Sequence, residues 1–384
     1  MTLRVAIIAG EVSGDLLGAG LMREMISQQP DVTFMGVGGE KMQKEGLSLV
    51  FPISDIAVMG FGDVIRRLPY LFRKLDEIAQ AIIQDKPDLI ICIDAPDFNH
   101  RLAKRLKKAG VVAPIIDYVV PSVWFWRSSR ARKMAKYFDH CLCLLPFEPA
   151  VMKRLGGPPC SFVGHNAVQS IASQKQVSGF RSSHKIGETE KLLTLLPGSR
   201  YGEVQKLLPL FIDVVSRLRK DIPSLRVFIP IVPHLREMIE KACQGLDIEF
   251  IIENDEKYAL FGASDAALAA SGTVALELGL ACTPMVVTYP SSDFFHKFII
   301  KFLAQTPSVN LVNIALDEPV VPEMLADNVT VENLYRLTSQ YLVQPDAAIK
   351  MRKKLEVFTA LMRGDGLSPD KKAAQVIFKL GGFL

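Results

Sequence analysis

The chain has 384 residues, of which 49% are hydrophobic, and this length favours two α/β domains of similar size over one. Its 45 basic and 41 acidic residues leave a formal net charge of +4, so we expect no nucleic-acid partner. The six cysteines lie mostly in apolar runs and form no metal-ligand set with histidine, which predicts reduced, buried thiols and a reducing compartment.

The first half of the chain alternates short apolar runs with helical patterns, which is typical of a parallel doubly wound sheet. No cationic and apolar leader precedes the first strand, and no apolar stretch reaches the length of a membrane-spanning helix. We therefore expect a cytoplasmic protein, or one that binds the inner face of the membrane without crossing it. Strands are expected near 3–9, 32–37, 88–93, 114–120 and 141–145.

Polar residues follow two of these strands. Glu11 and Ser13 follow the first strand, and Asp94 follows the third. Ligands of open α/β sheets bind beyond the carboxyl ends of the strands, and a carboxylate backed by apolar residues can act as a general base on an alcohol. We favour Asp94 as this base. Capping of the next helix is the alternative, for which Asp97 is the better candidate, and turn chemistry is the alternative for Glu11 and Ser13.

An apolar stripe with interleaved cations occupies residues 61–75. Pro69 is expected to kink or split a helix there. An ordinary amphipathic core helix is one interpretation, but the mainly cationic interleaving, which is repeated at 294–303, favours contact with a membrane surface. The apolar residues of the stripe are Phe61, Val64, Ile65, Leu68, Leu71, Phe72 and Leu75.

Both tryptophans of the chain lie close together, at Trp124 and Trp126. Aromatic surfaces beside a binding site often stack on sugars or cover lipid chains, so Trp124 and the nearby Ser122 are candidate acceptor contacts. The arginines that follow on a helix, among them Arg127 and Arg130, are expected to form a solvated basic face.

Polar and weakly patterned residues separate the two halves, and the second half again alternates strands and helices. Two Rossmann-like doubly wound domains that face a cleft, with C-terminal helices, form the GT-B architecture, which is the fold class we expect. The expected division is a domain at 1–170, a linker at 171–190, a domain at 191–344 and a helical tail at 345–384 that packs back on the first domain. Strands are expected near 191–196, 226–231, 248–252, 266–269 and 285–288.

Two strand-to-helix turns in the second half predict a nucleotide site. Free N–H groups at a helix start attract phosphate. Arg200, in the first turn, can bind a diphosphate with two parallel hydrogen bonds. Glu277 lies one helical turn beyond the second strand-to-helix turn and can accept hydrogen bonds from a ribose diol. A tight connection without a ligand is the alternative for each turn. The predicted nucleotide contacts are Ser199, Arg200, Ser271, Gly272, Thr273 and Glu277.

Seven motifs, in order and spread over nearly the whole chain, closely resemble the lipid-A-disaccharide synthase family. The resemblance implies an inverting, metal-independent GT-B transferase without a cofactor. The resemblance implies that Asp94 and Arg200 are essential. It also adds an asparagine to the nucleotide site, which is Asn313, or Asn310 if the motif is aligned differently. The motifs are GEVSGD (10–15), DAPDFN (94–99), PSVW (121–124), LPFE (145–148), FVGH (162–165), LPGSR (196–200) and SGTVALE (271–277).

The resemblance further implies a reaction of UDP-2,3-diacylglucosamine with 2,3-diacylglucosamine 1-phosphate (lipid X), which gives a β-1,6 disaccharide and UDP. Asp94 then takes the proton of the acceptor hydroxyl, and Arg200 with the second helix start stabilises the departing UDP. A UDP-N-acetylglucosamine 2-epimerase or another UDP-sugar transferase, and a non-catalytic membrane-surface scaffold, are the alternatives. The sequence leaves open whether the chain forms a homodimer.

Overall fold

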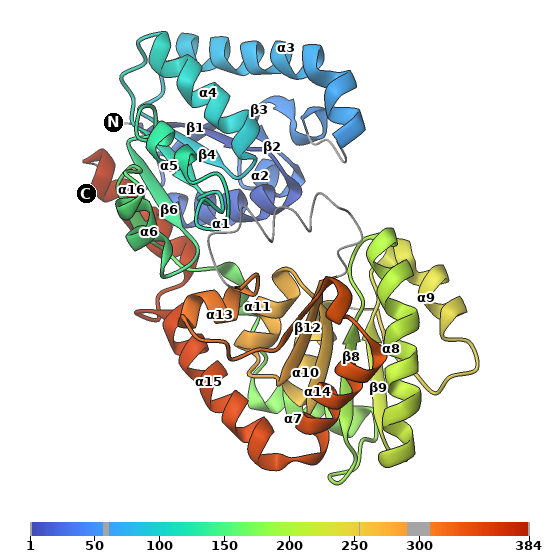
Figure 1. Cartoon of the computed structure of the whole chain (residues 1–384). Helices are drawn as coiled ribbons and strands as arrows, with labels where there is room; N and C mark the ends of the chain where they lie inside the picture. The colour runs from blue at the N-terminus through green and yellow to red at the C-terminus, as the bar shows by residue number, and fades with distance from the viewer. Residues whose placement is uncertain (1, 57–60, 253, 290–307, 383–384) are drawn as a thin grey trace. The chain divides into compact units, whose positions relative to one another are not determined.

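The computed structural model describes residues 2–56, 61–252, 254–289 and 308–382, and of 61–67, 254 and 255 it describes the backbone only. The chain forms two compact units. Unit 1 comprises Met1–Asn166 and Gly364–Leu384, and unit 2 comprises Ala167–Arg363. Each unit is a parallel sheet with flanking helices, so the predicted α/β fold of two doubly wound domains is confirmed (Figure 1).

The sheet of unit 1 has seven parallel strands in the order β3-β2-β1-β4-β5-β6-β7. All five predicted strands are present, and the two outermost strands, β3 and β7, were not predicted. The strands are β1 (Arg4–Ala9), β2 (Thr33–Gly38), β3 (Leu47–Pro52), β4 (Leu89–Ile93), β5 (Ile115–Tyr118), β6 (His140–Cys143) and β7 (Cys160–Phe162).

Helices cover both faces of this sheet because its strands are apolar on both sides. Ile7 and Ile91 belong to a core shared with α1, α2 and α16, whereas Ile8 and Cys92 belong to a core shared with α3 and α4. Figure 1 shows these helices beside the sheet. The helices of unit 1 are α1 (Val12–Gln28), α2 (Glu40–Lys44), α3 (Phe61–Asp85), α4 (Pro96–Lys108), α5 (Ser129–Met134), α6 (Glu148–Arg154) and α16 (Pro369–Gly381).

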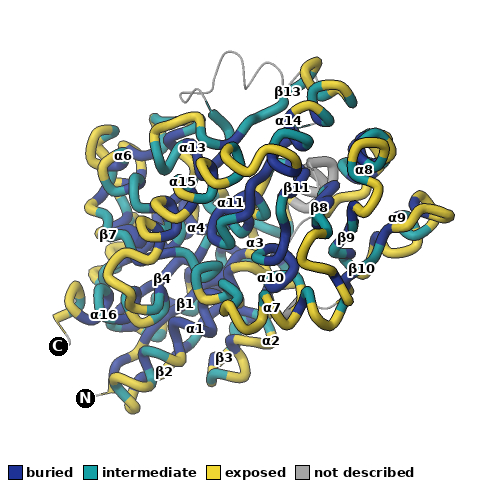
Figure 2. Tube along the Cα trace, turned by 90° about the horizontal axis from the view of Figure 1, so that it is seen from below, coloured by how far each residue is buried: buried dark blue, intermediate teal, exposed yellow. Residues whose placement is uncertain are grey.

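Unit 2 contains a six-stranded parallel sheet in the order β10-β9-β8-β11-β12-β13, whose central strands are buried (Figure 2). Its strands are β8 (Leu192–Leu196), β9 (Arg226–Pro230), β10 (Glu249–Ile251), β11 (Ala266–Ala270), β12 (Met285–Tyr289) and β13 (Glu323–Leu325). Its helices are α7 (Gln174–Ser183), α8 (Tyr201–Asp221), α9 (Arg236–Ala242), α10 (Asn254–Ala263), α11 (Thr273–Leu280), α13 (Leu311–Leu316), α14 (Val331–Val343) and α15 (Pro345–Arg363).

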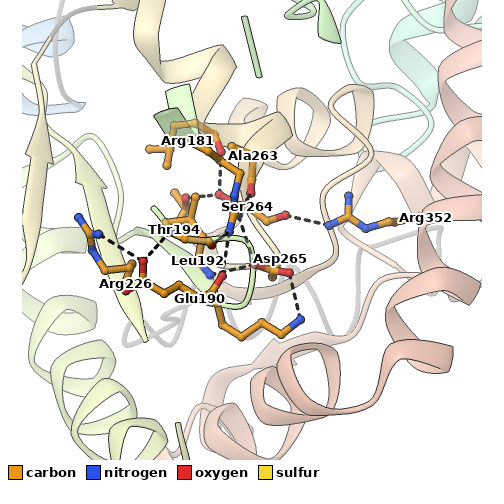
Figure 3. Close-up of polar contacts among 12 residues, drawn as sticks. Arg181, Glu190, Leu192, Thr194, Arg226, Ala263, Ser264, Asp265 and Arg352 are labelled. Carbon is orange, nitrogen blue, oxygen red and sulfur yellow. Dashed lines mark hydrogen bonds and ion pairs between the residues drawn. The ribbon is translucent and has the colours of Figure 1, made fainter. Parts of the chain in front are cut away.

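The expected linker at 171–190 is instead part of unit 2, because it contains α7. A capping box between Ser173 and Gln176 starts this helix. Arg181 then donates to the carbonyl oxygens of Ala263 at 3.1 Å and Glu190 at 2.8 Å, which ties α7 to α10 and to the start of β8 (Figure 3). The polar composition of this segment therefore reflects an exposed helix with polar anchors.

The expected C-terminal tail is divided between the two units. Its first helix, α15, belongs to unit 2, where Arg352 donates to the carbonyl oxygens of Ser264 at 2.9 Å and Cys282 at 3.2 Å (Figure 3). Its last helix, α16, packs against α1 in unit 1, and the Asn166 side chain donates to Asp370 at 3.1 Å. The chain therefore completes unit 1 only after it has formed all of unit 2.

Each sheet has one point where the strand order reverses direction along the chain. In unit 1 this switch point lies between β1 and β4, and in unit 2 it lies between β8 and β11. The loops that leave neighbouring strands there pass to opposite faces of the sheet and leave a crevice between them, so open α/β sheets bind their ligands at this place. The candidate site residues follow these four strands.

Candidate active site

Asp94 stands at the switch point of unit 1, directly after β4. The Ser13 hydroxyl, from the first turn of α1, donates to Asp94 Oδ2 at 3.1 Å. The backbone N–H of Ala95 donates to Oδ1 at 2.8 Å. Each carboxylate oxygen thus has one donor, and the predicted residues Ser13 and Asp94 come together although they are far apart in sequence.

The backbone at Asp94 is held in an unfavourable conformation. Asp94 and Ala95 have φ angles of 55° and 43°, in the left-handed region that costs a residue with a Cβ about 1–2 kcal/mol. The fully buried Asn99 holds this turn, because its side-chain amide donates to the carbonyl oxygens of Asp94 at 2.8 Å and Ile93 at 3.1 Å. Such strain persists where the surrounding structure enforces it, often at functional sites.

Gly10 is required for the same turn. A Cβ placed on Gly10 would lie 2.0 Å from the Cβ of Ala95, so no larger residue fits at the end of β1. The roles of Asn99 and Gly10 were not predicted, although both residues lie in the recognised motifs at 94–99 and 10–15.

Glu11 lies close enough to Asp94 for their charges to interact. Partial desolvation and, second, the negative charge of Asp94 raise the pKa of Glu11 above its ordinary value, although part of the residue is exposed. Like charges at one site disfavour each other's ionisation. The predicted residues Glu11, Ser13 and Asp94 therefore form one group at the end of the unit 1 sheet.

The prediction that Asp97 caps α4 is wrong. The N-cap position is occupied by Ala95, whose side chain makes no capping bond, and Pro96 follows it. Asp97 points to α5 instead, where its carboxylate accepts a hydrogen bond from Arg130 at 2.8 Å.

Trp124 is not placed to stack on a sugar, because its ring is buried. Its indole N–H donates to Glu148 at 3.3 Å, and its ring packs edge-on against Phe147. Burial raises the pKa of Glu148 to about 7. The predicted acceptor contact of Trp124 is therefore replaced by a structural role, whereas Ser122 is exposed and its contact stays a prediction.

In unit 2 the two predicted turns lie side by side, since β8 and β11 are neighbours with Leu196 opposite Ala269. The predicted order of strand, turn and helix is confirmed in both segments. Gly198 and Gly272 have φ angles of 118° and 152°, which favour glycine. The backbone N–H of Ser271 is already bonded to the Thr288 carbonyl oxygen at 2.7 Å, so it is not free for phosphate.

Arg200 precedes α8, and its side chain is 83% exposed. It donates to Glu203 at 3.1 Å, and the same carboxylate accepts the backbone N–H of Ser199 at 3.3 Å. An exposed ion pair of this kind contributes little free energy. The guanidinium can therefore exchange Glu203 for an anionic ligand at small cost. Neither Glu203 nor His234, whose ring nitrogen lies 3.2 Å from the Ser199 carbonyl oxygen, was predicted.

Glu277 lies one turn beyond the start of α11, and its side chain is 14% exposed. Lys257 Nζ lies 3.0 Å from each carboxylate oxygen, and the Tyr258 hydroxyl donates to Oε1 at 3.1 Å. A carboxylate can accept about four hydrogen bonds, so one further donor can be accommodated. Lys257 and Tyr258, on α10, orient this group and were not predicted.

Asn313 and Asn310 are both buried and have structural roles. The Asn313 amide donates to the carbonyl oxygen of Val321 and to Glu323 and accepts the Val321 N–H, at 2.7 to 2.8 Å. Asn310 caps α13 by accepting the N–H of Val312 at 2.8 Å. These contacts account for Asn313 without a nucleotide and do not support its predicted contact. The buried side-chain nitrogen of Asn310 has no hydrogen-bond partner among the described residues.

The predicted membrane stripe is partly core. Leu75 is buried and Leu71 packs against the core, whereas Leu68 and Phe72 are 37% and 44% exposed. The helix continues through Pro69 without the expected split. The predicted contacts of Phe61, Val64 and Ile65 and the segment 294–303 lie outside the described side chains.

Lys74, one of the predicted cations of this stripe, bonds Asp55 at 2.9 Å and Glu77 at 3.0 Å, so its charge is compensated within unit 1. No helix in the described ranges combines the length and apolarity that a membrane crossing demands. Within the same ranges, no three or more acidic, histidine or cysteine side chains are grouped to hold a metal ion. All six cysteines are free, and four are buried.

Sequence comparison identifies close relatives over the whole length. A family model described as lipid-A-disaccharide synthetase matches residues 5–377. A lipid-A-disaccharide synthase of Rhodospirillum centenum is 42% identical over 382 residues, which cover 98% of this chain and 94% of the relative. An enzyme of the same name from Nitrobacter hamburgensis is 38% identical and covers 98% of this chain and 95% of its own length.

Solved structures share the fold at low sequence identity. A UDP-GlcNAc 2-epimerase from Neisseria meningitidis, solved with UDP-GlcNAc, matches with a TM-score of 0.60 and 11% identity over 98% of this chain and 99% of its own. The glycotransferase of kitacinnamycin matches with a TM-score of 0.62 and 13% identity over 98% of each chain. These similarities extend over both units and show the two-domain GT-B fold alone.

Proposed function

Because the chain belongs to the lipid-A-disaccharide synthase family of hexosyltransferases, we propose that it joins UDP-2,3-diacylglucosamine to 2,3-diacylglucosamine 1-phosphate. The acceptor 6-hydroxyl attacks the anomeric carbon of the donor from the face opposite UDP. The new O–C bond forms as the bond to the UDP oxygen breaks. One displacement of this kind inverts the anomeric centre and gives a β-1,6-linked disaccharide 1-phosphate.

Asp94 carries this proposal. The attacking hydroxyl must lose a proton, and a carboxylate within hydrogen-bond reach can take it. Asp94 lies at the switch point of unit 1, with Ser13 on one oxygen and the Ala95 N–H on the other. These donors fix the orientation of the carboxylate, which pre-organises a general base. We therefore assign the acceptor to unit 1, with Glu11 and Ser122 as further polar contacts.

The nucleotide is assigned to unit 2. The leaving diphosphate gains negative charge, so a fixed positive group beside it lowers the barrier. The exposed Arg200 and the start of α11 lie at neighbouring strand ends and can supply this charge together. Glu277, oriented by Lys257, is assigned to one of the ribose hydroxyls.

Incubation with both lipid substrates tests the reaction directly. The proposal predicts UDP release that requires both substrates, together with a disaccharide product. An epimerase would convert a UDP-sugar without the acceptor and would release no disaccharide. A scaffold would bind lipid vesicles and turn over neither substrate. Either of these results contradicts the proposed reaction.

Glu277→Gln is expected to raise the Kd for UDP about tenfold, because a hydrogen bond to a charged group contributes roughly 1.5–3 kcal/mol. Calorimetry with UDP and with 2′,3′-dideoxy-UDP measures the effect. The variant and the wild type should bind the dideoxy nucleotide with equal affinity, since it lacks both ribose hydroxyls and therefore the one that Glu277 is assigned to bind. If the variant lost the same affinity for both nucleotides, the role of Glu277 would be to position Lys257 and not to bind ribose.

We also propose that the chain binds the inner face of the cytoplasmic membrane peripherally, through the exposed part of α3. Leu68 and Phe72 provide the apolar surface. Burial of such surface contributes roughly 25 cal/mol per Å², and a cation near anionic lipid adds about 1 kcal/mol. Neither contribution anchors a protein firmly, so binding should be weak and sensitive to salt.

Joint replacement of Leu68 and Phe72 by serine is expected to reduce binding to anionic liposomes in flotation and to raise the apparent KM for the lipid substrates. The affinity for UDP should not change. Replacement of Val357 and Leu361 by serine removes exposed apolar surface from α15 and serves as the control. Equal flotation of both variants and the wild type would contradict the proposed surface. Leu71→Ser, which alters the core, should instead lower the melting temperature.

A further inference from the structure

A strongly basic pocket lies in unit 1, between the first turns of α4 and the segment around α5. Its volume is about 540 Å³. Two of its cations, Arg127 and Arg130, were expected to form a solvated basic face. Arg127 is exposed and Arg130 is half-buried, and both line this hollow. One carboxylate, Asp97, lines the same pocket. The five basic side chains are Arg101, Lys104, Arg127, Arg130 and Lys133.

Most of this positive charge is uncompensated. Asp97 pairs with Arg130 at 2.8 Å. Within the described part of the chain, Lys104 and Lys133 have no ion-pair partner. The Arg127 guanidinium lies 4.2 Å from the centre of the Trp126 ring, a cation–π contact that holds it in place. Side chains of like charge raise the local concentration of anions, and here they surround one volume.

The floor of the pocket is polar and incompletely bonded. The ring of His100, which is buried, separates the pocket from the buried carboxylate of Asp117. His100 Nε2 and Asp117 Oδ2 lie 3.8 Å apart, and among the described residues neither atom has a hydrogen-bond partner. Buried polar atoms are normally bonded, but these two face each other, so the pair belongs to the interior of unit 1 and the basic side chains of the lining carry the argument for binding.

The pocket connects the proposed base to the proposed lipid surface. Helix α4 begins two residues after Asp94, and its pocket-lining residues extend from Pro96 to Lys104, about 12 Å along the helix axis. On the other side, the Arg101 guanidinium lies 5.5 Å from the centre of the exposed Phe72 ring. An anion in this pocket therefore borders apolar surface, which fits a phosphate carried by a lipid.

We infer that this pocket binds the anomeric phosphate of the acceptor. The inference rests on the proposed function, in which the acceptor presents its 6-hydroxyl to Asp94. A phosphate monoester carries close to two negative charges at pH 7 and three acceptor oxygens, which matches a cluster of cations with little competing carboxylate. The phosphates of the donor are assigned to unit 2, so the pocket serves the acceptor alone.

The double variant Lys104→Gln/Lys133→Gln tests the pocket. Its KM for 2,3-diacylglucosamine 1-phosphate should rise about tenfold or more, because charge-assisted hydrogen bonds to phosphate are lost. Its kcat and its KM for the UDP-sugar should remain those of the wild type. Lys108→Gln, which removes the same charge from an exposed position of α4 outside the pocket, is the matched control and should resemble the wild type.

The dephosphorylated acceptor, 2,3-diacylglucosamine, separates phosphate recognition from a general effect. The wild type should bind this lipid more weakly than the phosphorylated acceptor. The double variant and the wild type should have the same KM for it. An unchanged KM for the phosphorylated acceptor, or an equal rise for both acceptors, overturns the inference. These assays are run in nonionic detergent micelles and, in parallel, on phosphatidylglycerol vesicles. A defect seen only on the vesicles would assign the pocket to a membrane headgroup and also overturn the inference.

Failure of the proposed reaction is distinguishable from failure of the pocket. If the wild type releases no UDP with either acceptor, the proposed function is wrong. Calorimetry with the two acceptors then still compares the wild type with the double variant. A loss of affinity confined to the phosphorylated lipid supports the pocket, and equal affinities of both proteins overturn it.

Discussion

Asp94→Asn is expected to lower turnover by about 100-fold or more, while binding of the UDP-sugar persists. Asparagine keeps the size of the side chain. Its oxygen can accept the Ala95 N–H, and its amide nitrogen can donate to the Ser13 hydroxyl, which can also act as an acceptor, so the strained turn should remain. Asparagine cannot take a proton from the acceptor. The loss should therefore appear in kcat, which steady-state kinetics with both lipid substrates measures.

Asp88→Asn is the control for this variant, because Asp88 immediately precedes β4 and Asp94 immediately follows it. This control should keep normal turnover. Near-normal turnover in Asp94→Asn would reject Asp94 as the base. Glu11 would then be the next candidate, since desolvation and its charged neighbour raise its pKa.

Arg200→Ala is expected to cost on the order of 2–4 kcal/mol, about 30- to 1,000-fold, in UDP affinity or in kcat/KM. The reason is the loss of a forked, permanently charged donor beside the leaving diphosphate. The side chain is 83% exposed, so the melting temperature should stay that of the wild type. Calorimetry with UDP and steady-state kinetics together show whether the ground state or the transition state loses the contact.

Arg200→Lys should recover part of the loss, because lysine restores the charge without the bidentate geometry. Arg217→Ala is the matched control, since Arg217 is a half-exposed arginine near the other end of α8 whose partner is Glu332. Unchanged UDP affinity together with unchanged kcat/KM in Arg200→Ala would contradict the assignment of Arg200 to the diphosphate.

Local pattern predicted the sheets and the turns well, because both depend on residues that are neighbours in sequence. The run Leu192–Leu196 is largely apolar and is buried at both faces, and the turn after it, which contains Gly198, ends the strand. The same reasoning found Asp94 after β4. Since ligands of such sheets bind at strand ends, the candidate groups could be selected before their spatial arrangement was known.

The pairs that the sequence did not predict join distant residues. Lys257 orients Glu277 from a different helix, and Trp124 is buried because Glu148 receives its indole N–H. Asp97 is of a residue type that often caps helices, yet its carboxylate pairs with Arg130 of α5. In each case local propensity is overridden by a tertiary partner whose position depends on the packing of whole helices.

The return of α16 to α1 affects the order in which a ribosome can complete this protein. The core of unit 1 includes Ile377 and Phe378 of α16, packed with residues of α1 such as Met22 and Met25. These residues emerge after all of Ala167–Arg363, so unit 2 has its complete sequence available first. Nascent domains generally fold as units. During translation, the apolar face of α1 that α16 covers therefore stays uncovered until all of unit 2 has been synthesised.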